Sequence, residues 1–285
     1  AAAVSITDFA GRAISLAEYP RRIIALGNGE ADIVFALGGE LVGRPTSSSA
    51  PANEAFARIE QIGTAHEVDL ERITLLRPDV VLGNDPMNAK DVPVLEGIGA
   101  QVVLTSANAV DDVKRQIGLI GRLLGKEERA DELIRAIEEG EAAYRDRPAD
   151  AKPRVLLVYG APGTFMAALP NSLSGDILET AGGINIAADY PRLQSYPQYA
   201  QMNAERIVEA NPQMIFIMTH GDPEAVQASF VKEMQSNASW NGIDAVRNGR
   251  VEALPADLFG TNPGTRIVEA IAYMRDKLAS ASAPE

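Results

Sequence analysis

The chain contains the pattern E-R-I-x4-P twice, as ERITLLRP at residues 71–78 and as ERIVEANP at residues 205–212. An apolar run follows each copy, VVL at residues 80–82 and MIFI at residues 214–217. A short helix that ends at a proline and leads into a buried strand is typical of an α/β unit. The string therefore predicts the same unit in two parts of the chain.

Two further matches keep the same order. Pro20-Arg21-Arg22-Ile23-Ile24 is echoed by Pro153-Arg154-Val155-Leu156-Leu157. Asp32-Ile33-Val34, followed by LGG, is echoed by Asp176-Ile177-Leu178, followed by AGG. Unrelated α/β units also share proline and glycine punctuation. Three matches in one order favour two similar lobes whose loop lengths differ.

Between the two copies lies a segment of helical character. Residues 127–147 are rich in Ala, Glu and Arg, and predict one long helix. We therefore expect an N-terminal lobe at 1–126, a linking helix at 127–150 and a C-terminal lobe at 151–285. The expected fold class is α/β: two similar lobes with mainly parallel sheets, joined by one long rigid helix, with a ligand cleft between them.

Composition excludes several classes of function. The 285 residues carry a formal net charge of −13, which argues against nucleic acid and anionic membranes as partners. Cysteine is absent, so disulfides and thiolate metal sites are excluded. No apolar run is long enough to insert into a membrane.

Histidine occurs twice, once in each expected lobe. His66 lies in a loop that leads to a helix capped by Asp69, and His220 follows the predicted strand at 214–218. A lone loop histidine is usually a solvated surface residue, but two on opposite lobes could hold a metal between them. Zinc or manganese would need further ligands such as Glu67 or Asp222. Haem needs only axial ligands, so two histidines suffice.

An enzyme is the alternative from another class. The motif G-x-S-x-G is missing, and the nearest string, NSLSG at residues 171–175, does not match it. No phosphate-binding P-loop occurs, and GNG at residues 27–29 is only a fragment of a dinucleotide motif. A hydrolytic enzyme is therefore the less favoured interpretation, and we expect none.

The order of these elements resembles the helical-backbone solute-binding proteins, the iron-siderophore, cobalamin and haem receptors of ABC importers. Within that family, the chain is similar above all to the haem receptor of the iron-regulated surface determinant system. The matching strings are VGRPTS at 42–47, IG at 62–63, GAPG at 160–163, TAGGIN at 180–185, HGDPEAV at 220–226 and FG at 259–260. The resemblance covers nearly the whole chain and implies a haem receptor.

The resemblance assigns roles to single residues. It implies that His220 is an axial iron ligand, and that His66 replaces a methionine ligand. The chain departs from the haem receptors there but keeps a competent ligand. Met87 is a substitute ligand on the same lobe. Tyr190, Tyr196 and Tyr199 are substitutes on the other lobe, although each is more simply an ordinary loop residue.

The resemblance also implies partners. Glu71 and Glu205 would dock on a dimeric ABC permease, although a glutamate in a first helical turn is favoured by the helix dipole in any case. Gly29, Ser47 and Ser48 are candidates to hold the haem propionates. We expect a monomer in the periplasm, or an extracytoplasmic lipoprotein whose anchor has been removed. A siderophore or cobalamin receptor of the same fold is the alternative, and it would have no need of two histidines.

Overall fold

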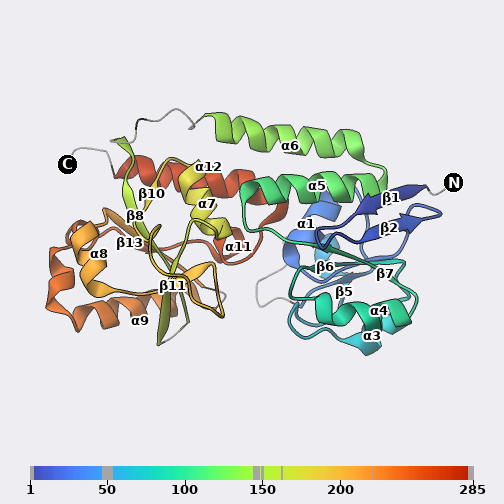
Figure 1. Ribbon diagram of the computed structural model, residues 1–285, viewed down its shortest axis with the longest axis horizontal. Coiled ribbons are helices and arrows are strands. Elements are labelled where there is room, and N and C mark those ends of the chain that lie inside the picture. The colour runs from blue at the N-terminus through green and yellow to red at the C-terminus, as the bar shows by residue number, and fades with distance from the viewer. Residues whose placement is uncertain are drawn as a thin grey trace. The chain divides into compact units, whose positions relative to one another are not determined.

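The structure is a computed structural model, and it describes residues 3–46, 54–143, 148, 151–161, 163–219 and 221–281 (Figure 1). The chain divides into two compact units. Unit 1 comprises Ala1–Ala107, Asp111–Ile137 and Pro263–Arg266. Unit 2 comprises Asn108–Val110, Glu138–Asn262 and Ile267–Glu285. The boundaries expected at 126 and 150 and a cleft between lobes stay predictions.

Unit 1 is built on a five-stranded sheet in the order β5-β4-β3-β6-β7. All neighbouring strands in it run parallel. The strands are β3 (Ile23–Ala25), β4 (Gly43–Arg44), β5 (Glu60–Gln61), β6 (Val80–Asn84) and β7 (Gln101–Thr105). All five carboxyl ends therefore lie along one edge of the sheet, where ligands of parallel α/β sheets bind.

Helices cover both faces of this sheet. The helices in this part of the chain are α1 (Asn28–Ala36), α2 (Glu54–Ala57), α3 (Leu70–Leu76), α4 (Val92–Gly97) and α5 (Val110–Leu124), with the 3-10 turns η1 (Ala89–Asp91) and η4 (Gly264–Arg266). Helix α6 (Glu127–Ala142) follows α5 and is divided between the two units. Figure 1 shows α1 and α5 on one side of the sheet and α3 and α4 on the other. Ile73 of α3 and Leu95 of α4 are buried against Ile24, Val81 and Val102 of the strands.

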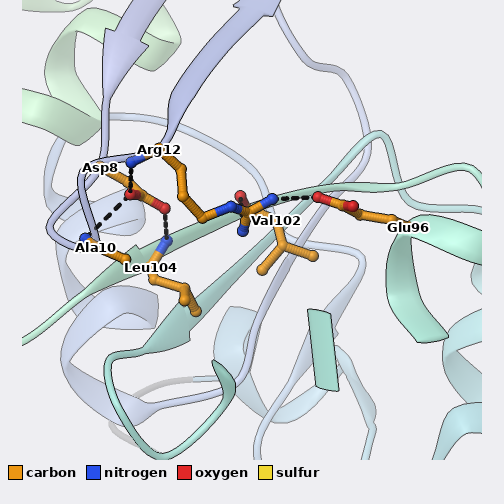
Figure 2. Close-up of polar contacts among 6 residues, drawn as sticks. All are labelled: Asp8, Ala10, Arg12, Glu96, Val102 and Leu104. Atoms are coloured by element: carbon orange, nitrogen blue, oxygen red, sulfur yellow. Dashed lines mark hydrogen bonds and ion pairs between the residues drawn. The ribbon is translucent and has the colours of Figure 1, made fainter. Parts of the chain in front are cut away.

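A hairpin that the sequence patterns did not predict precedes this sheet. Strands β1 (Val4–Thr7) and β2 (Ala13–Leu16) pair antiparallel. The buried carboxylate of Asp8 accepts hydrogen bonds from the N–H groups of Ala10, Arg12 and Leu104, at 3.0, 2.9 and 3.0 Å (Figure 2). Arg12 also pairs with Glu96 of α4. The turn of the hairpin is thereby fixed to the end of β7.

Unit 2 is built on a six-stranded sheet, in which β11-β9-β8-β12-β13 are consecutive and β10 pairs with β8. The strands are β8 (Arg154–Ala161), β9 (Thr164–Ala168), β10 (Ile184–Asn185), β11 (Tyr199–Gln201), β12 (Met214–Met218) and β13 (Val251–Ala253). β8 pairs parallel with β10 and β12, and β12 pairs parallel with β13. Only the pairs with β9 are antiparallel.

The helices of unit 2 again lie on both faces of its sheet. They are α7 (Leu173–Thr180), α8 (Ala204–Ala210), α9 (Pro223–Gln235), α10 (Asp244–Arg247), α11 (Ala256–Phe259) and α12 (Ile267–Ser280), with the 3-10 turn η3 (Ala238–Gly242). Figure 1 shows α8 and α9 on one side, α7 and α12 on the other. Ile207 and Phe230 join Ile215 and Trp240 in the core on the α8–α9 side.

The repeat in the sequence is a repeat in the fold. In unit 1, Asp69 caps α3 by accepting a hydrogen bond from the Arg72 N–H, and Arg77 ends the helix at φ 49°. In unit 2, Asn203 caps α8 by accepting one from the Arg206 N–H, and Asn211 ends it at φ 48°. The predicted α/β fold with two lobes and mainly parallel sheets is confirmed.

Some predicted boundaries shift. Helix α1 begins at Asn28, directly after Gly27, whose backbone is extended (φ −124°, ψ 155°). The long helix expected over 127–147 is α6, which ends at Ala142. Residues 144–147 and 149–150 lie outside the described residues. The strand predicted at 214–218 is β12, with the same bounds.

Candidate functional site

The candidate site begins at the carboxyl edge of the unit 1 sheet. α1 and Gly29 follow β3, the His66 loop (residues 63–69) follows β5, and the segment with Met87 follows β6. His66 is exposed, Met87 is half-buried and Gly29 is buried in the first turn of α1. The parallel sheet therefore brings three of the predicted site residues to one edge.

The His66 loop is closed at its base. Gly63 begins it at φ 93°, a conformation that disfavours any side chain, and forms an antiparallel bridge with Val68. The Asp69 N–H donates to the Ile62 carbonyl oxygen at 2.7 Å, and the Glu67 N–H donates to Thr64 Oγ1 at 3.1 Å. These bonds hold the backbone on both sides of His66.

A second anchor joins the His66 loop to the segment that carries Met87. Asn88 is 1% exposed, and its Nδ2 donates to the Ala65 carbonyl oxygen at 2.9 Å. Its Oδ1 accepts a hydrogen bond from the Asn84 N–H at 2.8 Å, directly at the end of β6. Lys90 Nζ donates to the His66 carbonyl oxygen at 3.1 Å. The backbone of His66 is thus tied to the same segment as Met87.

The buried turn at Gly29 has a polar network behind it. Glu30, Thr105 and Gln116 are all buried, and Gln116 Nε2 donates to Thr105 Oγ1 at 3.0 Å. Burial raises the pKa of Glu30 to about 6, while a hydrogen bond with Thr105 acts in the opposite direction. In the described part of the chain, no hydrogen bond links Gly29 to the His66 loop or to Met87.

Three predicted site residues, Ser47, Ser48 and His220, lie outside the described residues. The described neighbours of position 220 are Thr219 and Gly221. Thr219 is buried, and its Oγ1 accepts a hydrogen bond from the Gly221 N–H at 3.0 Å. Asp222 caps α9. These described residues, after the end of β12 and at the start of α9, lie at the carboxyl edge of the unit 2 sheet.

The three candidate tyrosines have different surroundings. Tyr190 is buried, with the Arg206 guanidinium 4.3 Å from its ring centroid. Tyr196 is 57% exposed. The Tyr199 ring lies 5.2 Å from the ring of Tyr159, and burial raises the pKa of Tyr199 to about 12. The three tyrosines are therefore not equivalent as candidate ligands.

The sequence patterns did not single out three residues near the carboxyl edges of the two sheets: Arg44 and Asn88 in unit 1, and Tyr159 in unit 2. Tyr159 lies opposite Met218, the last residue of β12, and its place at the end of the apolar run 155–158 was a usable signal. Arg44 was noted only as part of a matching string. Asn88 carried no signal, because its role depends on a carbonyl group 23 residues away.

Glu71 and Glu205 occupy equivalent positions. Each is exposed and lies two residues after the N-cap of its helix. The adjacent arginines have ion-pair partners: Arg72 pairs with Glu60 at 3.1 Å, and Arg206 pairs with Asp189 at 2.9 Å. Within the described ranges, neither glutamate forms an ion pair or a side-chain hydrogen bond.

The described residues lack two features. They contain no cluster of three or more His, Asp or Glu side chains able to hold a metal ion. None of their helices is both long and apolar enough to cross a bilayer.

The chain is similar to several known proteins. The High-affinity heme uptake system protein IsdE of Staphylococcus aureus is 26% identical over 238 residues, which are 83% of this chain and 80% of IsdE. The crystal structure of a periplasmic heme binding protein from Pseudomonas aeruginosa is 26% identical and covers 93% of this chain and 95% of that chain, with a TM-score of 0.77.

The same fold occurs in the structure of an ABC-type Fe3+-hydroxamate transport system from Saccharomonospora viridis. It has a TM-score of 0.74 at 24% identity, over 96% of this chain and 98% of that one. The family described as periplasmic binding protein matches residues 23–258. The chain therefore belongs to the periplasmic binding proteins of ABC importers, a family of non-enzymatic solute receptors.

Proposed function

We propose that the protein is an extracytoplasmic haem receptor that binds haem between its lobes and delivers it to an ABC permease. His66 and His220 are the proposed axial ligands of the iron. The observation that carries the proposal is the anchoring of His66. Its imidazole is exposed, while Asn88 and Lys90 bind the backbone carbonyls of Ala65 and His66 itself. An exposed imidazole on a fixed backbone suits a metal ligand.

The coordination chemistry supports haem over a bare metal ion. A structural zinc site takes four protein ligands, and in a chain with no cysteine and two histidines carboxylates would have to complete the set. Haem brings four equatorial nitrogens and needs only axial ligands. The chain contains two histidines in all, one in each half of its sequence. Names of relatives add support, since IsdE and the Pseudomonas aeruginosa protein are described as heme proteins.

Met87 is the substitute ligand in unit 1. It lies on the segment to which Asn88 ties the His66 loop, so it belongs to the same edge. Tyr199 is a weaker candidate in unit 2. Ferric iron binds tyrosine as the phenolate, and the pKa of Tyr199 at about 12 disfavours that form. Gly29, Ser47 and Ser48 remain the candidates for the propionates.

Delivery would use Glu71 and Glu205. Both are exposed, stand at equivalent places in the two units and face no partner among the described residues. One acidic residue from each unit would then meet a basic residue of each permease subunit, which attracts the loaded receptor by charge complementarity.

A hemin titration followed by absorption spectroscopy tests this function. The expected result is tight binding with the spectrum of low-spin, six-coordinate ferric haem carrying two imidazoles. A high-spin spectrum with a tyrosinate charge-transfer band would contradict the ligand assignment. The rival is a ferric siderophore or cobalamin receptor, because a hydroxamate transport protein shares the fold. Binding of either of these compounds, with none of hemin, would overturn the proposal.

A further inference from the structure

Arg44 ends strand β4 at the carboxyl edge of the unit 1 sheet. Its backbone adjoins the start of the His66 loop, because the Ile62 N–H donates to the Arg44 carbonyl oxygen at 3.0 Å. The Thr46 N–H donates to the Gly63 carbonyl oxygen at 2.8 Å. Arg44 therefore belongs to the same edge as His66.

The Arg44 side chain is buried without matching partners. It is 4% exposed. Nη1 donates to the Pro45 carbonyl oxygen at 3.2 Å, and the guanidinium lies 5.0 Å from the centroid of the Phe56 ring. Nε is buried and has no hydrogen-bond partner in the structure. A buried polar group in this state is unfavourable, and a buried cation more so.

No acidic side chain nearby neutralises this charge. Glu54 pairs with Arg58 at 3.6 Å, and Glu60 pairs with Arg72 at 3.1 Å. The sequence of residues 47–53, SSSAPAN, contains no carboxylate. Within the described ranges, Arg44 forms no ion pair. A buried guanidinium without a counter-charge lowers stability, so an anion that arrives with a ligand would relieve that penalty.

We propose that Arg44 binds a carboxylate of the ligand. This inference rests on the proposed function, and it narrows the ligand to a tetrapyrrole with a free carboxylate. The planar fork of arginine matches a carboxylate with two parallel hydrogen bonds, and Nε is one of the two donors for such a pair. The propionates of haem supply this group.

The cover over Arg44 is slight. Phe56 belongs to α2, a helix of one turn with no buried residue of its own. The Phe56 ring also contacts the Phe35 ring of α1, with centroids 5.5 Å apart. Displacement of this one turn would uncover the face of the guanidinium that the Phe56 ring covers.

The test compares two ligands and three proteins. Hemin and hemin dimethyl ester are titrated into the wild type, Arg44→Met and the control Arg58→Met. Both ligands carry the same iron and ring, and only hemin has free carboxylates. We expect the wild type to bind hemin roughly 10- to 100-fold more tightly than the ester. Arg44→Met should lose that preference, and Arg58→Met, at an exposed arginine, should keep it.

The unliganded proteins separate binding from structure. Arg44→Met should unfold at the wild-type urea concentration or above, because the change removes a buried charge without a partner. Lower stability with an unchanged preference for hemin would overturn the inference and make Arg44 a structural residue. Failure of the wild type to bind either compound would instead overturn the proposed function. If the wild type binds both compounds with equal affinity, the role of Arg44 is rejected and the proposed function stands.

Discussion

Asn88 determines how the proposed iron ligand of unit 1 is held. Its side chain is buried and connects the end of β6 to the carbonyl of Ala65, beside His66. A buried amide with bonds at both ends specifies one geometry for the two segments that it joins. The position of the His66 backbone is therefore a property of its neighbours as much as of its own loop.

Glu30 predicts a pH dependence of stability. Burial raises the pKa of Glu30 from 4.5 to about 6. Between these pH values the Glu30 carboxyl is therefore mostly protonated in the folded state and mostly ionised in the unfolded state. The tighter binding of this proton stabilises the folded state below pH 4.5, and that stabilisation is lost as pH rises through about 6. Glu30→Gln removes this effect, and should make the variant more stable than the wild type at pH 8 by up to about 2 kcal/mol.

Urea denaturation of the unliganded protein at pH 4.5 and pH 8 measures this difference. Glu128→Gln, at an exposed position of α6, serves as the control and should match the wild type at both values. A gain from Glu30→Gln that is the same at both pH values would show that ionisation of Glu30 is not its cause.

Single residues were predictable from the sequence only where scarcity or repetition pointed to them. His66 was found because the chain has two histidines, and Glu71 because its string recurs. Arg44 and Asn88 could not be singled out in this way. Their roles depend on burial and on partners distant in sequence, such as the Ala65 carbonyl for Asn88. Periodicity and spacing do not encode such contacts.

At the scale of elements, α3 and α8 are the best-predicted parts of the molecule. Their strings predicted the two helices and the strands that follow, and Asp69 was predicted as the cap of α3, while the Asn203 cap of α8 was not. The hairpin β1–β2 was missed, because its strands are four residues long and its attachment depends on Asp8 reaching Leu104. Short strands alternate too briefly for a pattern to identify them.

The two helix ends differ in a way that predicts opposite mutational effects. Arg77 and Asn211 both adopt the left-handed conformation, at φ 49° and 48°. A long side chain is strained there, and asparagine tolerates it better. Arg77→Gly should therefore raise the free energy of unfolding by about 0.5–1 kcal/mol.

Asn211→Gly is the matched comparison. Asn211 Oδ1 accepts a hydrogen bond from the Asp244 N–H at 2.8 Å. Because glycine cannot form this hydrogen bond, Asn211→Gly should lower the free energy of unfolding by about 1 kcal/mol. Urea denaturation of both variants checks the pair. If Arg77→Gly is destabilising, the strain assigned to Arg77 is wrong.

At the scale of the molecule, the repeat supplies one exposed glutamate in each unit. Replacing both, Glu71→Ala with Glu205→Ala, should leave hemin affinity within about twofold of wild type, because neither residue is at a proposed ligand position. Haem uptake through the permease should fall by roughly tenfold or more, since two charge pairs are lost at once.

The control for this experiment is Glu128→Ala with Glu139→Ala, which removes two exposed acidic residues of α6. It preserves the net-charge change of the test variant and should transport normally. If the Glu71 and Glu205 variant transports haem normally, the docking role is wrong, and the two glutamates only stabilise the first turns of their helices.

The measurement that tests the central claim most directly is hemin titration into the wild type, His66→Ala, His220→Ala and the double variant. Position 220 directly follows the buried strand β12 and Thr219, so its loss should weaken binding more than loss of His66, for which Met87 can substitute. The double variant should lose the low-spin spectrum and most of its affinity. Wild-type affinity with an unchanged Soret band in the double variant would contradict the account.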